Sequence, residues 1–287
     1  MATLLNPTPD ATMLSRALAR WSLTRPTLIA ETATSLVYRV ERTGQPPAVL
    51  KLLKPGSGED ERNGGSLLVW YAGNGAAAIY GLARDAVLME LADGETLGDV
   101  ARVGRDAEAT EILCDTVAKL HAPRDAAPPA GLEPLRERFE ALFRVGAAAW
   151  PRQARDLVGR ATGIAYNLFD KPMEIIPLHG DIHHDNIVSG ARGWVAIDPK
   201  GLIGDPAYDY ANSFLNPEEG DDFVISASRV ARHSHAIAAR TGIPRRHLLA
   251  WASAHAALSA AWDIEDGNPV TQQISILPLL LGAYDTA

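Results

Sequence analysis

The chain has 287 residues, of which 47% are hydrophobic and 22% are charged, and it carries a net charge of −8. This composition is ordinary for a soluble protein, and the length suffices for one large domain or for two lobes around a cleft. The negative charge disfavours non-specific binding to nucleic acid. Cys114 is the only cysteine, so an intrachain disulfide is excluded and a reducing compartment, the cytoplasm, is expected. The sequence contains neither a signal-peptide pattern nor an apolar run of membrane-spanning length, so we expect no membrane partner.

The first part of the chain predicts a helix followed by a small antiparallel sheet. Residues 10–21 place apolar side chains at helical spacing. Three short runs rich in apolar and β-branched residues predict strands at 27–30, 36–41 and 48–53. A further apolar strand is predicted at 86–92, where it ends at the turn signal Asp93-Gly94.

Two features of this sheet suggest contacts with phosphate. Lys51 lies among apolar residues of the third strand, and an ammonium in such surroundings is costly unless it meets an anion. We interpret Lys51 as a residue that reaches nucleotide phosphates, although a surface lysine lying along apolar neighbours gives the same pattern. The turn at 31–35 has no glycine, so it is not by itself evidence of nucleotide binding. Its backbone N–H groups and the hydroxyls of Thr34 and Ser35 could contact phosphate oxygens, but a plain connecting turn explains it equally well.

The remainder of the chain reads mainly as helices. Residues 59–71 predict a helix next to the sheet, and residues 175–178 predict a short strand. Cys114 falls within a helical pattern, where we interpret it as a small core residue. Apolar periodicity predicts further helices at 106–121, 133–148, 152–169, 222–240, 245–262 and 271–281. His121 ends the first of these helices, and we assign it a structural role.

The stretch from residue 178 to residue 209 carries the chemistry. Residues 188–189 and 194–197, joined by a Gly-Ala-Arg-Gly turn, predict a β-hairpin. Because a hairpin returns the chain on itself, Asn186 before it and Asp198 after it should lie side by side. Asp181, five residues before Asn186, should line the same pocket.

A carboxylate, an amide and a second carboxylate around one point are what a phosphoryl-transfer site requires. We predict that Asp181 is the catalytic base, which aligns an acceptor hydroxyl and takes its proton. Asn186 and Asp198 are predicted to bind Mg²⁺, which prefers oxygen ligands.

The other polar residues of this stretch receive supporting roles. His179 is expected to hold the loop by hydrogen bonding. His183 and His184 are adjacent on an extended segment and should point apart, so a shared metal is disfavoured. We expect Asp209 to brace the backbone of the catalytic loop. Lys200 is either near the phosphates or solvated.

The ordered series His179-Gly180-Asp181, Asn186, Ile197-Asp198, Gly204-Asp205-Pro206 and Asp209 resembles the aminoglycoside phosphotransferase family. The segments HGDIHHDN and IDPKGLIGDPAYD are most similar to its streptomycin 6-kinase and hydroxyurea-resistance branch. The resemblance implies an α+β, two-lobed, protein-kinase-like fold, with a sheet lobe over residues 1–92 and a mostly helical lobe over 93–287.

The same resemblance implies ATP, with GTP as the alternative, as the phosphate donor, together with Mg²⁺. It places Met89 at the back of the adenine pocket and the carbonyl of Glu90 and the N–H of Ala92 against the base. It implies a small-molecule acceptor, cationic as aminoglycosides are. Acidic residues at 218–222 and 263–266 would then pair with its ammonium or guanidinium groups.

One departure from the family concerns the partner of Lys51. Family members carry an acid seven residues before the tryptophan of the helix at 59–71, and this chain has Asn63 there. Glu59 or Glu61 takes over this role, or the ion pair is missing.

Three alternatives stay open. The acceptor is another small alcohol or sugar-like metabolite, or the protein binds nucleotide without catalysis. A metallophosphoesterase shares the Gly180-Asp181-Ile-His183 pattern but also requires an earlier Asp-x-His, which this sequence lacks before it.

Overall fold

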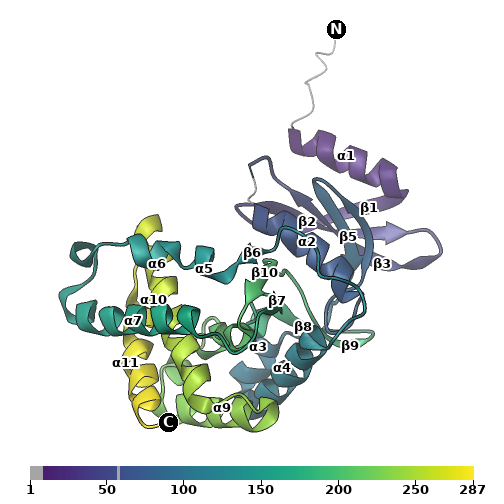
Figure 1. Ribbon diagram of the computed structural model, residues 1–287. Coiled ribbons are helices and arrows are strands. Elements are labelled where there is room, and N and C mark those ends of the chain that lie inside the picture. The colour runs from purple at the N-terminus through teal and green to yellow at the C-terminus, as the bar shows by residue number, and fades with distance from the viewer. Residues whose placement is uncertain (1–8, 57–58) are drawn as a thin grey trace.

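The computed structural model describes residues 9–56 and 59–287. It has a sheet-containing N-terminal lobe and a larger, mostly helical C-terminal lobe (Figure 1). The two-lobed α+β fold predicted from the sequence is therefore confirmed.

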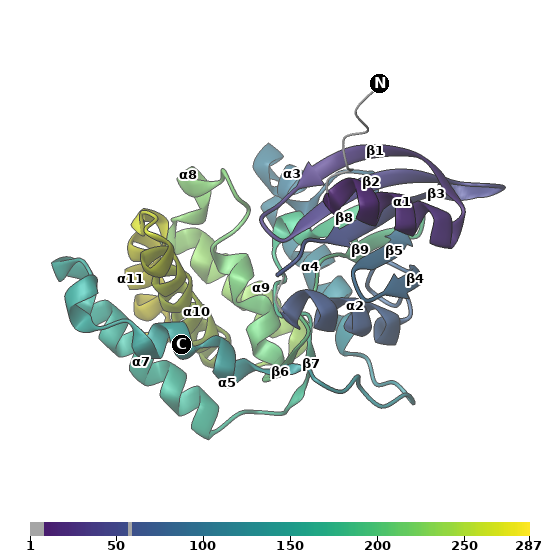
Figure 2. The ribbon, with the colours of Figure 1, turned by 90° about the horizontal axis from the view of Figure 1, so that it is seen from above.

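The N-terminal lobe is built on one antiparallel sheet. Its strands are β1 (Leu23–Glu31), β2 (Ser35–Arg42), β3 (Gln45–Leu53), β4 (Ile79–Ala83) and β5 (Ala86–Glu90), in the order β1-β2-β3-β5-β4. Strand β4 was not predicted, because its burial alternates only weakly and Gly81 interrupts its register with β5. Helix α1 (Pro9–Trp21) packs its apolar side chains on the sheet, and α2 (Glu59–Tyr71) lies on the side that faces the C-terminal lobe (Figures 1 and 2).

Helices fill the C-terminal lobe, on the side of the molecule away from the N-terminal sheet (Figure 2). They are α3 (Leu97–Val100), α4 (Asp106–His121), α5 (Leu135–Arg138), α6 (Glu140–Arg144), α7 (Arg155–Asp170), α8 (Asp221–Val224), α9 (Ala227–Thr241), α10 (Arg245–Asp266) and α11 (Thr271–Asp285). Buried apolar residues from most of these helices form one continuous core. Among the described residues, no helix is both long and apolar enough to cross a membrane.

The structure divides two of the predicted helices into shorter ones. The helix predicted over 133–148 is split into α5 and α6, because the chain bends at Phe139, whose fully buried ring packs against Phe169, Tyr208 and Trp251. The helix predicted over 222–240 is split into α8 and α9. Its second part begins at Ser226, whose hydroxyl accepts a hydrogen bond from the backbone N–H of Arg229.

Two small sheets lie between the lobes and carry the predicted site. Strands β6 (Glu133–Pro134), β10 (Leu202–Gly204) and β7 (Ile176–Leu178) form one of them. The other is the predicted hairpin, β8 (Ile187–Gly190) paired with β9 (Gly193–Ala196) in antiparallel register. In Figure 1, β6, β7 and β10 lie between the N-terminal sheet and helices α7 and α10, while β8 and β9 lie below that sheet, next to α3 and α4.

Burial of a neutral histidine makes stability depend on pH. His255 lies inside α10 with Nδ1 3.2 Å from the Tyr208 hydroxyl, and burial lowers its pKa to about 4. In the unfolded chain the imidazole takes up a proton near its ordinary pKa of about 6.5. Between these two values the unfolded state binds more protons, so the free energy of unfolding falls as the pH falls.

We predict that His255 makes the free energy of unfolding fall by about 1.4 kcal/mol per pH unit between pH 6.5 and 4. Urea unfolding at a series of pH values measures this slope. The slope measured for His255→Gln should be smaller by that amount. His235→Gln changes an exposed histidine of α9 and should keep the slope of the original chain. Equal slopes for all three proteins would contradict the assignment.

Candidate active site

The carboxylate of Asp209 holds the backbone that follows β7. It accepts hydrogen bonds from the N–H groups of His179 at 3.1 Å and Gly180 at 2.7 Å, and from His121 Nε2 at 2.8 Å. Gly180 has φ of +82°, and a Cβ there would lie 2.6 Å from Leu202 Cγ, so only glycine fits this bend. The predicted bracing role of Asp209 and the structural role of His121 are confirmed.

His179 ties the catalytic loop to the end of the hairpin. Its Nε2–H donates to the carbonyl of Ile197 at 2.9 Å, and its Nδ1 accepts from the N–H of Asp181 at 3.3 Å. Both ring nitrogens are therefore used by a neutral imidazole, and burial lowers the pKa of His179 in agreement with this state. The predicted hydrogen-bonding role is confirmed.

The hairpin brings Asn186 and Asp198 to the same end, as the sequence predicts. The N–H of Ile197 donates to the carbonyl of Asn186 at 2.9 Å, directly beyond the paired residues Ile187 and Ala196. Asp198 has a left-handed backbone with φ of +60°, which is uncommon outside glycine. This conformation turns the chain sharply where it leaves the hairpin.

Two lysines from different parts of the fold meet on Asp198. Lys51 Nζ contacts Oδ1 from strand β3, and Lys200 Nζ lies 3.0 Å from Oδ2. Burial alone would raise the pKa of Asp198, but the charges of Lys200 and Lys51 hold it below its ordinary value. The carboxylate is therefore ionised and is the meeting point of both lobes.

Asp181 is held by an amide that sequence reasoning missed. Asn212 Nδ2 donates to Asp181 Oδ1 at 3.0 Å, and Asn216 Nδ2 donates to Asn212 Oδ1 at 3.0 Å. The second bond fixes the orientation of the Asn212 amide, so that its NH₂ group faces the carboxylate. The one signal in the sequence was the position of Asn212 three residues after Asp209, which places both on neighbouring short helical turns.

The donor set formed by Asn186 and Asp198 fits Mg²⁺. Asn186 Nδ2 donates to the carbonyl of Asp181 at 3.0 Å, and this orientation leaves Oδ1 of the amide as the atom suited to a cation. Mg²⁺ commonly takes one or two protein ligands of this kind and completes its shell with water and substrate phosphates. Within residues 9–56 and 59–287, no group of three or more His, Cys, Asp or Glu side chains forms a metal site of its own.

The predicted adenine site is joined to the hairpin by an ion pair. Met89 lines a cavity of about 20 Å³ together with Lys51 and Asp198. Glu90 accepts hydrogen bonds from Arg192 Nε at 3.0 Å and from the N–H of Ala78 at 3.0 Å, and its backbone N–H donates to the carbonyl of Ala78. Sequence reasoning missed this ion pair, because Arg192 was assigned only to a turn.

The segment after β5 runs along the hairpin. Ala92 passes so close to Gly190 that a Cβ on that glycine would lie 3.2 Å from Ala92 Cα. The N–H of Gly94 donates to the carbonyl of Ser189 at 3.0 Å, and the N–H of Ser189 donates to the carbonyl of Glu95 at 3.0 Å. Backbone hydrogen bonds therefore join the edge of the predicted base site to the hairpin that leads to Asp198.

The turn between β1 and β2 is closed by its own hydroxyls. Thr32 Oγ1 accepts from the N–H of Ser35 at 3.0 Å and lies 3.0 Å from Ser35 Oγ. Ser35 is buried, whereas Thr34 is half-buried and its carbonyl accepts from the N–H of Lys54 at 2.8 Å. Of the two residues predicted to contact phosphate, only Thr34 retains side-chain exposure.

Helix α2 makes an unusually close approach to the segment after the hairpin. A Cβ on Gly64 would overlap the carbonyl oxygen of Pro199, and a Cβ on Gly201 would lie 2.6 Å from Asn63 Cβ. Glycine lowers the stability of a helix, but the absence of a side chain at Gly64 allows α2 to touch the backbone next to Asp198. The side chains of Glu59 and Glu61, the alternatives to Asn63 as partners of Lys51, lie outside the described residues.

The remaining predicted residues are two histidines and a set of acids. His183 Nδ1 accepts from the N–H of Asp185, while His184 is fully buried beside His233, so the two rings point apart as predicted. Of the acids expected near an acceptor, Glu218 and Glu219 are exposed, whereas Asp263 accepts from Gln273 and Glu265 pairs with Arg144. The side chains at 221–222 lie outside the described residues.

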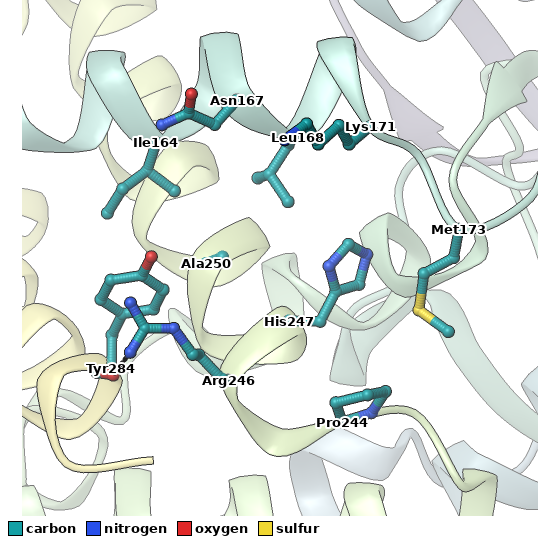
Figure 3. Close-up of a pocket in the computed structure, with 10 residues that line it drawn as sticks. All are labelled: Ile164, Asn167, Leu168, Lys171, Met173, Pro244, Arg246, His247, Ala250 and Tyr284. Atoms are coloured by element: carbon teal, nitrogen blue, oxygen red, sulfur yellow. Dashed lines mark hydrogen bonds between the residues drawn. The ribbon is translucent and has the colours of Figure 1, made fainter.

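A separate cavity of about 380 Å³ lies between α7 and the beginning of α10, away from Asp181 and Asp198 (Figure 3). Lys171, Arg246 and His247 are among its lining residues. His247 Nε2 donates to Asp205 Oδ2 at 2.8 Å, and Asp205 also accepts from the N–H groups of Met173 and Ala207. The cavity thus touches the outer side of the turn that carries Asp209 and contains none of the predicted site residues.

A two-lobed fold with an acid, an amide and a second acid gathered beneath a sheet lysine is the arrangement expected of a kinase. The chain belongs to the aminoglycoside/hydroxyurea antibiotic resistance kinase family, which it matches over residues 20–267. It is accordingly a phosphotransferase that acts on hydroxyl groups, and the family resemblance predicted from its motifs is confirmed.

Its relatives include kinases of streptomycin. It is 42% identical over 255 residues to streptomycin 3''-kinase of Klebsiella pneumoniae, covering 86% of this chain and 91% of the relative. It is 30% identical over 266 residues to streptomycin 6-kinase of Streptomyces griseus, covering 89% and 83%. Among solved structures, a thermostable mutant of aminoglycoside phosphotransferase APH(4)-Ia in complex with AMP-PNP and hygromycin B superimposes with a TM-score of 0.64 at 14% identity, covering 95% of this chain and 97% of that one. This last likeness concerns the fold.

Gly64→Ala should lower activity although alanine is the better helix former. The added Cβ displaces the carbonyl of Pro199 and with it Asp198, and a misplacement of about 1 Å can lower kcat/KM by about 100-fold. Gly159→Ala is the matched control, because that helical glycine in α7 has no atom near its missing Cβ. The control should gain about 0.5–1 kcal/mol of stability and keep full activity.

Steady-state kinetics and thermal unfolding of both variants measure these effects. Full activity in the Gly64 variant would show that the close approach of α2 does not matter for catalysis.

Proposed function

We propose that this protein transfers the γ-phosphoryl group of ATP, with Mg²⁺, to a hydroxyl group of streptomycin or a closely related aminoglycoside. The observation that carries the proposal is the arrangement of Asp181, Asn186 and Asp198 around one point beneath Lys51. Membership of the kinase family supports the reaction type. The acceptor is supported by the 42% identity to a streptomycin 3''-kinase over most of both chains.

Asp181 acts as the catalytic base in this proposal. The acceptor oxygen forms a bond to the γ-phosphorus while the bond from that phosphorus to the bridging oxygen of ADP breaks. The hydroxyl proton passes to the Asp181 carboxylate late in the reaction, because the transition state is loose. Asn212 donates to Oδ1 of Asp181 at 3.0 Å and Asn186 donates to Oδ2 at 3.4 Å, so the carboxylate is held in one orientation for the acceptor.

The residues at the donor end bind the nucleotide. Asn186 and Asp198 hold Mg²⁺, which when bound neutralises phosphate charge. Lys51 contacts the phosphates, and Thr34 lies on the turn above them. Ser35 is better placed to hold that turn, because it is buried and contacts Thr32.

At the base, Met89 forms the back wall, and the carbonyl of Glu90 and the N–H of Ala92 read the edge of adenine. These backbone groups would meet a different set of donors and acceptors on guanine. Competition between ATP and GTP therefore tests this part of the proposal.

The acceptor is expected to be cationic. Exposed carboxylates at Glu218 and Glu219 lie two and three residues after Asn216, which is connected to Asp181 through Asn212. The net charge of −8 favours the approach of a cation in addition. Both observations support an aminoglycoside over an anionic sugar.

The decisive assay incubates purified protein with Mg–ATP and a panel of streptomycin, other aminoglycosides, hydroxyurea and small alcohols. Mass spectrometry should show the addition of one phosphoryl group to streptomycin, and EDTA should stop the reaction. Transfer to hydroxyurea or another alcohol alone would replace streptomycin as the acceptor. No transfer to any member of the panel would refute the proposal.

Asp181→Asn should lower kcat by about 100- to 10,000-fold, because the amide cannot accept the hydroxyl proton. Nucleotide binding should survive, since Asp181 faces the acceptor, and a thermal shift with Mg–ATP measures it. Asp170→Asn, at an exposed position at the end of α7, is the control and should behave like the unchanged chain. Undiminished turnover in the Asp181 variant would remove this residue from its role.

A further inference from the structure

Lys200 lies between the two acids of the site. Its Nζ is 3.0 Å from Asp198 Oδ2 and 3.7 Å from Asp181 Oδ2, and its side chain is 17% exposed. Under the proposed function, Asp181 faces the acceptor and Asp198 faces the cation. The lysine therefore occupies the space that separates the acceptor end of the site from the nucleotide end.

The backbone keeps this lysine in place. The N–H of Lys200 donates to the carbonyl of His179 at 2.8 Å, which joins it to the catalytic loop. The next residue, Gly201, has φ of +70° and packs against Asn63 of α2. Lys200 is thus fixed both to the loop that carries Asp181 and to the helix that contacts the segment after Asp198.

We propose that Lys200 is a catalytic residue that binds the γ-phosphoryl group during its transfer. The inference rests on the proposed function. When Asp198 and Asn186 hold the cation, Asp198 gives up its ion pair with Lys200. The ammonium then donates to an oxygen of the phosphoryl group that passes between the two acids.

The chemistry of the step calls for a cation at this point. The acceptor oxygen bonds to the γ-phosphorus, the bond to ADP breaks with its electron pair left on ADP, and Asp181 takes the hydroxyl proton. Negative charge is spread over the three equatorial oxygens of the transferring group. A positioned cation in a part-buried site stabilises such charge more than water does.

Lys51 is placed for a different task. It reaches Asp198 from β3 of the N-terminal lobe and contacts Oδ1, whereas Lys200 contacts Oδ2 from the side of the catalytic loop. The two ammonium groups therefore approach opposite oxygens of one carboxylate. In this arrangement, Lys51 contacts the phosphates that stay on the nucleotide, and Lys200 contacts the phosphoryl group that leaves it.

A merely structural lysine would behave differently from a catalytic one. If Lys200 only held its segment in place, its removal would displace Asp198 and weaken cation binding together with catalysis. If it leaves Asp198 when the cation binds, its removal abolishes a competitor for the carboxylate. Cation binding should then be equal or tighter while turnover falls.

Lys200→Met keeps the length of the side chain and removes its charge. We expect kcat to fall by about 100- to 1,000-fold, as when a positioned transition-state donor is removed, with KM for ATP largely unchanged. Mn²⁺ affinity in the presence of AMP-PNP, measured from the electron paramagnetic resonance signal of free Mn²⁺, should be equal or higher. Lys200→Arg should recover part of kcat.

Lys171→Met is the control, because that exposed lysine lines the separate cavity of Figure 3, and it should alter neither quantity. A Lys200→Met protein with undiminished kcat would overturn the inference. So would a loss of Mn²⁺ affinity that accompanies the loss of kcat. Failure of the proposed function is distinguishable, since it would appear as absence of transfer by the unmodified chain.

Discussion

The geometry of the site depends on one fully buried carboxylate. Asp209 has no exposed side-chain surface, and removing such a group from water is costly unless strong hydrogen bonds replace the solvent. It meets this requirement by accepting from two consecutive backbone N–H groups and from His121, so it is satisfied only if the loop at 179–180 takes its bent form. The bend in turn needs a glycine at 180 and directs Asp181 toward the hairpin.

The same physical chemistry explains what could be predicted from the sequence. Asp181, Asn186 and Asp198 lie within 18 residues, and a hairpin is a local structure whose turn residues are visible in the sequence. Their convergence therefore followed from short-range rules. The helix over 106–121 was predicted with its bounds for the same reason, because apolar periodicity determines which face is buried.

The contacts that were missed connect residues far apart in the chain. Arg192 and Glu90 are 102 residues apart, and Asn212 is 31 residues from Asp181. No local sequence pattern predicts such pairs. Gly64 is a different case. Local propensity marks glycine as unfavourable for a helix. It is tolerated here because of a close contact with Pro199, which only the tertiary structure contains. The break at Phe139 likewise arises from the packing of its ring in the core of the C-terminal lobe.

The two ends of the proposed site are held by different kinds of contact, and this determines what each relative can show about them. At the nucleotide end, the segment after β5 and the hairpin are joined by backbone hydrogen bonds and by the ion pair of Glu90 with Arg192. Backbone hydrogen bonds need no particular side chain, so a fold can be shared with APH(4)-Ia at 14% identity. At the proposed acceptor end, Asn216 donates to Asn212 and Asn212 donates to Asp181, and exposed acids follow these residues in the sequence. Under the proposed function, side chains would carry the recognition there, so a relative with 42% identity informs the choice of acceptor, whereas a fold neighbour informs only the architecture.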